Sequence, residues 1–196
     1  MPHFPPATQA LILINTAIFC LNIALEGLLT RWFALYPLGF GFLPWQLGTY
    51  AFLHDNFSHL FFNMLGVWMF GAELERLWGP KRFLQLFAAS VLSAAALQMG
   101  LVWSLGSLAP TVGASGGLFG FLLAYAMLFP NRIIVPLIPP IPMKAKVFAA
   151  IFGGLELLLG VSNPASGVAH FAHLGGMLGA FILIKYWRKK SPFGRY

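Results

Sequence analysis

Long apolar runs alternate with short polar or Pro- and Gly-rich breaks along the whole chain. Six runs are each near the roughly 20 residues that an α-helix needs to cross the hydrocarbon core of a bilayer. They cover residues 10–29, 57–72, 83–104, 113–129, 145–161 and 168–187. The breaks are YPLGFGFLPWQ, ELERLWGPKR, SLGSLAPTVG, PNRIIVPLIPPIPMK and GVSNPASG. The pattern predicts an all-α polytopic membrane protein whose six transmembrane helices form a single domain over residues 1–196.

The first break, residues 31–51, is too apolar for a loop that is free in water. Its rings at Trp32, Tyr36 and Trp45 suit the headgroup level of a membrane, which amphipathic aromatic side chains favour. We therefore expect this loop to lie in the membrane interface as short amphipathic pieces. A lid packed over the helix bundle fits the same composition.

Composition supports the assignment to a membrane. The chain is 59% hydrophobic and only 9% charged, whereas a soluble domain carries about 25% charged residues. The single cysteine, Cys20, excludes an internal disulfide and a Cys-based metal site. The first apolar run lacks a preceding basic residue and a small-residue cleavage pattern, so we interpret it as a retained span rather than a signal peptide.

The formal net charge of +7 is compatible with a nucleic-acid partner, but the distribution of charge indicates topology instead. With six spans, both chain ends and the second and fourth loops lie on one side of the membrane. Every Lys and Arg except Arg31 falls on that side, and basic loops stay on the cytoplasmic side. We therefore expect a multi-pass protein of a bacterial inner membrane with both termini in the cytoplasm. We expect no nucleic-acid partner, and an attraction of the KYWRKK segment to anionic lipid.

Polar residues recur near the outer starts of the second, fourth and sixth spans. At about 1.5 Å of rise per residue, four of them fall into one layer, roughly 10 Å below the outer face of the bilayer core. They are His59, Asn63, Ser115 and His173. Because polar side chains are costly in lipid, they should face the interior of the bundle and one another.

Helix spacing favours contact between these groups. His59 and Asn63 are four residues apart and share one face of a helix. Gly176 lies one turn below His173 on the same face, and the glycines of the fourth span leave similar gaps. Missing side chains let two helices approach closely, so the fourth and sixth spans can bring Ser115 near His173.

Ser115 has three interpretations from its surroundings. In GASGG it can be a small residue that packs helices through Gly-x-x-x-Gly spacing. The Gly-x-Ser-x-Gly pattern of a nucleophile elbow needs a preceding strand, which this chain does not predict. At a helix start, free N–H groups and the positive end of the dipole also stabilise an anion, such as a tetrahedral oxyanion.

A serine nucleophile needs a base within hydrogen-bond reach, and the polar layer offers only histidines. No acid adjoins Ser115 or His173 in the sequence, which favours a Ser–His dyad over a triad. We interpret Glu156 as a hydrogen-bonded packing residue near the outer end of its span rather than a proton relay. His170 is interpreted as a loop-anchoring or solvated residue.

The histidines do not predict a metal site. His54 and His59 are five residues apart and should point in different directions, and the only cysteine lies in another span. A tetrahedral zinc site needs convergent nitrogen and sulfur ligands. We therefore predict that no metal is bound.

Four motifs, HLFFN, GAELERLWG, GASG and AHLGG, follow one another along the chain. With them the sequence resembles the rhomboid family of intramembrane serine proteases over essentially all six spans. The resemblance implies that Ser115 is the nucleophile and His173 the general base. It also implies an oxyanion hole formed by His59, Asn63 and the backbone N–H of Ser115.

The same resemblance implies supporting roles for the neighbouring motif residues. Gly113 and Ala114 precede the nucleophile, Phe119 stands where a ring (commonly Tyr) stacks on the base, and Gly176 belongs to AHLGG. The family cleaves membrane-anchored proteins near their transmembrane segments without metal or cofactor. The implied partners are therefore transmembrane protein substrates and membrane lipid. The pair Trp45–Gln46 departs from the Trp-Arg of some members.

Two other functions stay open from the sequence. A small membrane transporter or channel would use the same polar layer for ions or substrate, and it would give Gly113–Gly117 no chemical role. A non-catalytic rhomboid-like protein would bind membrane helices without cutting them.

Overall fold

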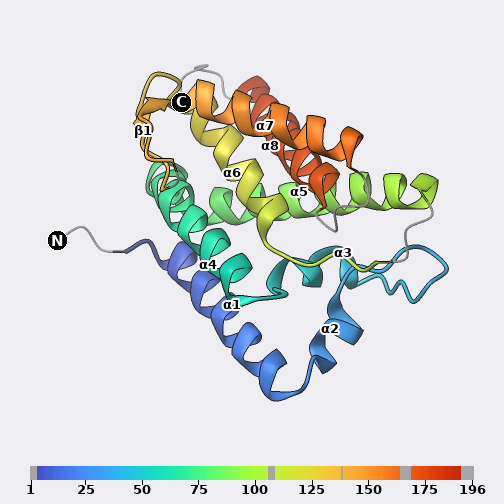
Figure 1. The fold of residues 1–196 in the computed structure, drawn as a ribbon. Helices are drawn as coiled ribbons and strands as arrows, with labels where there is room; N and C mark the ends of the chain where they lie inside the picture. Colours follow the sequence, from blue (N-terminus) through green and yellow to red (C-terminus); the bar gives the residue numbers. More distant parts are fainter. Residues whose placement is uncertain (1–3, 106–108, 138, 164–168, 191–196) are drawn as a thin grey trace.

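The computed structural model describes residues 4–105, 109–137, 139–163 and 169–190, which form a mostly helical bundle (Figure 1). Its helices are α1 Pro6–Ala24, α2 Leu28–Phe33, α3 Gln46–Thr49, the 3₁₀-helix η1 Tyr50–Phe52, α4 Phe57–Gly66, the π-helix η2 Val67–Gly71, α5 Ala72–Leu105, α6 Ser115–Leu128, α7 Ala145–Ser162 and α8 His170–Lys190. A short antiparallel hairpin pairs β1 Ile133–Ile134 with β2 Met143–Lys144. The predicted start of the last span at residue 168, and Arg195, lie outside the described residues.

Three helical segments within the described residues are long and apolar enough to cross a membrane. They are Pro6–Ala24, Phe57–Leu101, which runs from α4 into α5, and Ala145–Ser162. The helix Ser115–Leu128 is apolar but shorter. A helical membrane protein is therefore confirmed in outline, and the six crossings stay a prediction.

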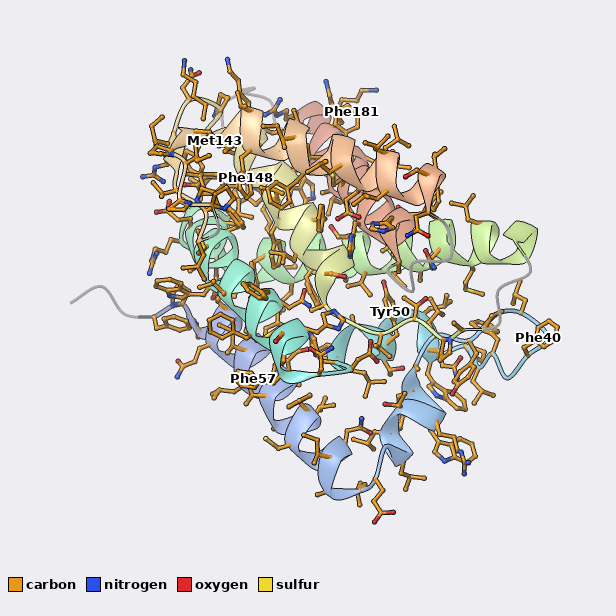
Figure 2. All side chains as sticks on the ribbon, viewed as in Figure 1. Phe40, Tyr50, Phe57, Met143, Phe148 and Phe181 are labelled. Carbon is orange, nitrogen blue, oxygen red and sulfur yellow. The ribbon has the colours of Figure 1, made fainter. Side chains whose placement is uncertain are left out.

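Apolar side chains cover the outside of the bundle as well as its core. Phe40 lies at the edge of the molecule and Phe57 near the start of α4 in Figure 2, with 59% and 69% of their surface exposed, whereas Tyr50 is buried with 1%. Exposed apolar surface costs about 25 cal/mol per Å² in water, and lipid removes that cost because its tails are equally apolar. The exterior is therefore suited to a bilayer.

The first helix ends earlier than its apolar run predicts. α1 stops at Ala24 rather than at residue 29, because Glu26 and Gly27 adopt positive φ angles of 51° and 81° and turn the chain. Leu28 and Leu29, the last residues of the run, begin the separate helix α2. The predicted bound at residue 29 is therefore wrong.

The stretch ELERLWGPKR is largely helical, so the prediction of a break there is wrong in its first half. The helix continues from α4 through η2 into α5, and only Gly79, with φ 77° and ψ 167°, interrupts it before Pro80. The charged residues of this stretch are good helix formers. One of them, Glu75, is buried because its carboxylate accepts hydrogen bonds from the N–H groups of Ala7 (2.9 Å) and Thr8 (2.6 Å). These N–H groups belong to the first turn of α1 and have no partner within that helix.

α8 packs against α5 and α6 through glycines on two of its sides. A Cβ at Gly176 would overlap the backbone oxygen of Gly116, so α8 and α6 meet backbone to backbone. A Cβ at Gly179 would lie 2.6 Å from the carbonyl oxygen of Ala89 on α5. These close approaches bring the N-terminal turns of α6 and α8 together near the middle of the bundle.

The first loop combines short helices with a packed interior. Gln46, fully buried, holds it together. The Gln46 Oε1 atom accepts hydrogen bonds from the N–H groups of Tyr36 (3.2 Å) and Leu43 (3.1 Å), and its Nε2 donates to the carbonyl of Trp32 (3.3 Å). Trp32 and Trp45 stay about half exposed, with 53% and 48% of their surface accessible. The loop thus has the short helical pieces that the sequence predicts, and its packed interior also fits the alternative of a lid over the bundle. Gln46, which stands where some members of the resembled family have Arg, is held by these hydrogen bonds.

Candidate active site

The segment that leads into α6 is fastened to the first loop. Leu35 and Thr111 exchange two backbone hydrogen bonds, at 3.0 and 2.9 Å. Two residues later, the N–H of Gly113 donates to the carbonyl of Tyr50 at 3.0 Å. The loop therefore sets the position of the backbone directly before Ser115, a role for Tyr50 that no sequence motif indicated.

Gly113 and Ala114 turn the chain into the helix. Gly113 adopts a φ of 120°, which side-chain-bearing residues rarely reach. α6 then begins at Ser115, and its first backbone hydrogen bond runs from the N–H of Leu118 to the carbonyl of Ala114 at 2.9 Å. The N–H groups of the first helical residues have no partner within the helix. They are therefore free to bind an anion beside the Ser115 side chain.

Ser115 and His173 lie in contact across α6 and α8. The Oγ of Ser115 lies 2.7 Å from Nε2 of His173, a hydrogen-bond distance. The His173 ring stacks on Phe119, with centroids 4.4 Å apart and planes only 2° from parallel. His173 is largely buried, so these contacts hold a histidine ring with little access to solvent.

His59 lies beside Gly113, two residues before the serine. A Cβ at Gly113 would lie 2.6 Å from Nε2 of His59 and 3.7 Å from the Oγ of Ser115, so the imidazole and the hydroxyl flank this glycine. The start of α4 is fixed by Asn56, whose side chain accepts a hydrogen bond from the N–H of His59 at 2.9 Å. This cap orients the first turn of α4 and with it the His59 ring.

Asn63 is buried one turn further along α4. Its Nδ2 donates to the backbone carbonyl of His59 at 2.9 Å, and its Oδ1 has no hydrogen-bond partner within the described residues. An amide nitrogen carries two N–H groups, so one of them is still available after this bond. Asn63 can therefore donate a second hydrogen bond.

His54 lies against His59, contrary to the prediction that the two point in different directions. Their rings meet edge to face with centroids 5.0 Å apart. The prediction assumed helical spacing, but Leu53 and Asn56 are extended and fold the chain back before α4. His54 is buried, and neither of its ring nitrogens has a hydrogen-bond partner among the residues described. The pKa of His54 is lowered to about 3, mainly by burial and secondarily by the nearby His59, so this ring is neutral at physiological pH.

Glu156 is hydrogen-bonded, as the sequence suggested, but its neighbours are two histidines of α8 rather than packing groups alone. Its Oε2 lies 2.6 Å from Nδ1 of His170 and 2.9 Å from Nδ1 of His173. Of the two interpretations of His170, loop-anchoring or solvated, the solvated one is wrong, because its side chain is buried and hydrogen-bonded to Glu156. An acid does therefore adjoin His173, and it comes from α7. Sequence reasoning missed it because only tertiary packing brings α7 to α8; the one signal was an acid within an apolar span.

The two contacts of Glu156 differ in direction. Nδ1 of His170 is aligned with Oε2 as in a hydrogen bond. Nδ1 of His173 lies within the same range but has no aligned hydrogen-bond partner in the described part of the chain, so its 2.9 Å contact is short and bent. Glu156 is thus held by His170 and stands beside His173.

The same three residues have the composition of a metal site. Glu156, His170 and His173 each offer one ligand atom, and these atoms all lie within 4.8 Å of one another. However, the ring-nitrogen to carboxylate distances of 2.6 and 2.9 Å are hydrogen-bond distances, so the carboxylate contacts both rings directly. That no metal is bound stays a prediction.

The arrangement has the parts that serine chemistry requires. A hydroxyl contacts an imidazole nitrogen at the start of a helix with free N–H groups, a second imidazole lies beside Gly113, and an amide lies one turn further along α4. An activated serine needs a base in hydrogen-bond contact, and a tetrahedral intermediate needs donors around its oxyanion. All of these groups lie within a bundle whose exterior is apolar.

Comparison with known proteins relates this region to one family. The family model described as a Rhomboid domain matches residues 42–190. Rhomboid protein 1, mitochondrial, of Saccharomyces cerevisiae is 33% identical over 140 residues, which are 65% of this chain and 37% of the yeast protein. Rhomboid protease GluP of Bacillus subtilis is 31% identical over 143 residues, 70% of this chain and 25% of that protein.

Rhomboid protease AarA of Providencia stuartii is 26% identical over 204 residues, covering 91% of this chain and 72% of that protein. The chain spans well under two thirds of the length of the yeast and Bacillus relatives. The matched residues 42–190 include every candidate site residue described above. The resemblance found in the motifs is thereby confirmed at the level of the family.

Proposed function

The chain belongs to the rhomboid family, and we propose that it is an intramembrane serine endopeptidase that cleaves membrane-anchored proteins within or next to a transmembrane segment. The observation that carries this proposal is the 2.7 Å contact between the Oγ of Ser115 and Nε2 of His173 inside an apolar helical bundle. The relatives GluP and AarA are named as rhomboid proteases, which supports the same reaction class.

In the proposed reaction His173 acts as the general base for Ser115. The Oγ–H proton moves to Nε2 as Oγ bonds to the scissile carbonyl carbon, and the carbonyl π electrons move to its oxygen. The proton on Nε2 then passes to the leaving amide nitrogen as the C–N bond breaks. Water hydrolyses the acyl-enzyme in a second round with the same base. The stacked Phe119 ring keeps His173 in the orientation that these transfers need.

His59, Asn63 and the backbone N–H of Ser115 are proposed to stabilise the oxyanion. His59 flanks Gly113 next to the hydroxyl, and Asn63 keeps one amide N–H available after its bond to the His59 carbonyl. Donors fixed before the reaction act strongly in a site that excludes water, because they need no reorganisation when charge develops.

The protein is integral to a membrane, and we propose that all six helical runs cross it. The charge distribution favours a bacterial inner membrane with both termini in the cytoplasm. Transmembrane proteins are the proposed substrates, because a site within a bundle reaches segments in the same bilayer. No metal or cofactor is required by the proposed steps.

Covalent labelling combined with a cleavage assay tests this function. A fluorescent fluorophosphonate reacts with an activated serine, and a model single-span protein reports cleavage. We expect the wild-type protein to be labelled and to cleave, and Ser115→Ala to do neither, since loss of a nucleophile costs several orders of magnitude in rate. Ser58→Ala, which changes an exposed serine on α4, is the matched control and should behave as wild type.

The outcomes separate the alternative functions. Ion or solute flux without labelling would indicate a transporter or channel. Retention of the model substrate without labelling or cleavage would indicate a non-catalytic helix-binding protein. Cleavage by Ser115→Ala at the wild-type rate would rule out serine catalysis.

A further inference from the structure

An acidic side chain in the lipid-exposed helix α7 reaches inward to the proposed base. Glu156 stands between Leu155 and Leu157, which are exposed on the outside of the bundle, yet its own side chain is only 14% exposed. The same face of α7 carries two glycines that meet α8: a Cβ at Gly153 would lie 3.3 Å from Met177, and one at Gly160 would lie 3.0 Å from Phe171. Glu156 lies between these two contacts, so the close packing of α7 on α8 directs its carboxylate to the histidines of α8.

We propose that Glu156 is a positioning residue that sets the tautomer and orientation of His173 and converts the Ser–His pair into a Ser–His–Glu arrangement. This inference rests on the proposed function and adds a residue to it. The carboxylate comes from a separate helix, whereas the nucleophile and base come from α6 and α8.

The tautomer of His173 follows from its two contacts. The hydroxyl of Ser115 can donate its proton to Nε2 only if Nε2 carries no proton, so the single proton of a neutral ring must sit on Nδ1. Nδ1 faces Oε2 of Glu156 at 2.9 Å. An ionised carboxylate only accepts hydrogen bonds, so Glu156 favours the tautomer with Nδ1–H. A histidine with the other tautomer could not take the proton of Ser115.

The charge of Glu156 matters after the proton transfer. When Nε2 takes the proton of Ser115, His173 becomes a cation. A carboxylate at contact distance stabilises that cation more strongly in a water-poor interior than in water. Glu156 itself gains no proton in this step; it stabilises the charged ring, as the acid of a serine triad does.

His170 explains why the carboxylate stays in place although its contact to His173 is bent. Nδ1 of His170 is aligned with the same oxygen at 2.6 Å, and His170 precedes His173 by nearly one turn of α8. Catalytic hydrogen bonds are often misaligned in a free enzyme and tighten when substrate or charge arrives. His170 thus holds Glu156 beside the base, and a small rotation of the carboxylate aligns it with Nδ1 of His173.

Glu156→Gln is the central test because it keeps the shape and one acceptor oxygen but removes the charge. We expect turnover of the model substrate to fall about 10–100-fold, a smaller loss than that of a well-aligned triad acid, with little change in KM because Glu156 is proposed to act through His173 and not on substrate. Glu156→Leu should lose more. The control is Glu73→Gln. It removes an acid that forms an ion pair with Arg132 at 2.7 Å, on a part of the molecule away from the site, and should leave kcat unchanged.

A second readout does not depend on activity. The ¹⁵N NMR shifts of histidine-labelled protein distinguish a ring protonated at Nδ1 from one protonated at Nε2. The signals that disappear in His173→Ala belong to His173. In wild-type protein we expect these signals to show the tautomer with Nδ1–H. In Glu156→Leu these signals should move to a mixture of tautomers, while Glu73→Gln should match the wild type.

The two readouts distinguish failure of this inference from failure of the proposed function. If the wild-type protein neither cleaves nor takes up fluorophosphonate, the proposed function fails, and the tautomer signals still test the role of Glu156. If Ser115→Ala is inactive but Glu156→Gln keeps kcat within about twofold and the His173 tautomer is unchanged, the inference is overturned. If Glu156→Leu fails to fold, the nearly isosteric Glu156→Gln variant is used for both tests. Its turnover then tests the kinetic prediction, and its ¹⁵N spectrum tests the tautomer of His173.

Discussion

At the scale of single residues, His173 is held by contacts on three sides of its ring. Nε2 faces the Oγ of Ser115 at 2.7 Å, Nδ1 faces Glu156 at 2.9 Å, and the ring face stacks on Phe119. A base works only when its nitrogen stays within hydrogen-bond reach of the proton that it takes. The surroundings therefore restrict both the rotation of the ring and the position of its proton.

The two histidines of α8 should differ in their effect on cleavage. We expect His173→Ala to be inactive, because it removes the group in contact with Ser115. His170→Ala should keep substantial turnover, reduced about fivefold, since it removes one hydrogen bond to the carboxylate, worth about 1 kcal/mol. Initial rates on the model substrate measure both. A dead His170→Ala beside an active His173→Ala would contradict the assignment of the base.

Asn63 should affect turnover more than binding. Asn63→Ala removes a donor that is proposed to meet charge only in the transition state, and one such donor is worth about 2.7–4 kcal/mol. We expect the loss of transition-state stabilisation to lie at the lower end of this range. His59 and the backbone N–H of Ser115 remain as donors, and one N–H of Asn63 is already bound to the His59 carbonyl. The measurement is kcat and KM on the model substrate. A raised KM with unchanged kcat would show that Asn63 holds substrate instead.

At the scale of elements, the site depends on how closely α6 and α8 approach. The two backbones touch where Gly176 faces Gly116, because neither glycine bears a side chain. The same glycines that look like packing residues in the sequence therefore set the distance between the serine and the base. Packing and chemistry are served by one interface.

Gly176→Val should inactivate the protein by separating these helices. A Cβ at this position would overlap the carbonyl oxygen of Gly116, and a displacement of about 1 Å can cost roughly a hundredfold in rate. Gly154→Ala on α7 is the matched control, because a Cβ there meets nothing within 4 Å. Fluorophosphonate labelling and the thermal midpoint are measured for both. A Gly176→Val protein that is labelled at the wild-type rate would show that the close approach is not needed.

Much of this arrangement could be predicted from the sequence, and the misses have physical causes. The apolar runs located the helices, and the common depth of the polar residues, with the glycine gaps in the fourth and sixth spans, predicted that Ser115 and His173 lie close together. The end of α1 was missed because a turn at Glu26 and Gly27 interrupts a run that stays apolar. Glu156 was missed because contacts between helices depend on their relative rotation, and one sequence carries no signal for that.

At the scale of the whole molecule, contacts at the two ends of the bundle agree with the predicted arrangement of loops. Arg132 and Glu73, both assigned to the cytoplasmic side, form an ion pair at 2.7 Å. Leu35 and Thr111, from loops assigned to the opposite side, pair through two backbone hydrogen bonds. The relative placement of these loops is therefore consistent, and the charge rule alone decides which end faces the cytoplasm.

That decision can be tested with single cysteines in a Cys20→Ser background. We expect Arg31→Cys to react with a membrane-impermeant maleimide in intact cells, and Lys189→Cys to react only after the membrane is opened. Both side chains are exposed, so access depends on the side of the membrane. Orientation also fixes the depth of the site, because Ser115 starts α6 on the side of Arg31. Cleaved domains should therefore be released on the outer side. If Lys189→Cys were labelled in intact cells, the predicted orientation would be wrong, and the cleaved domains would be expected on the cytoplasmic side instead.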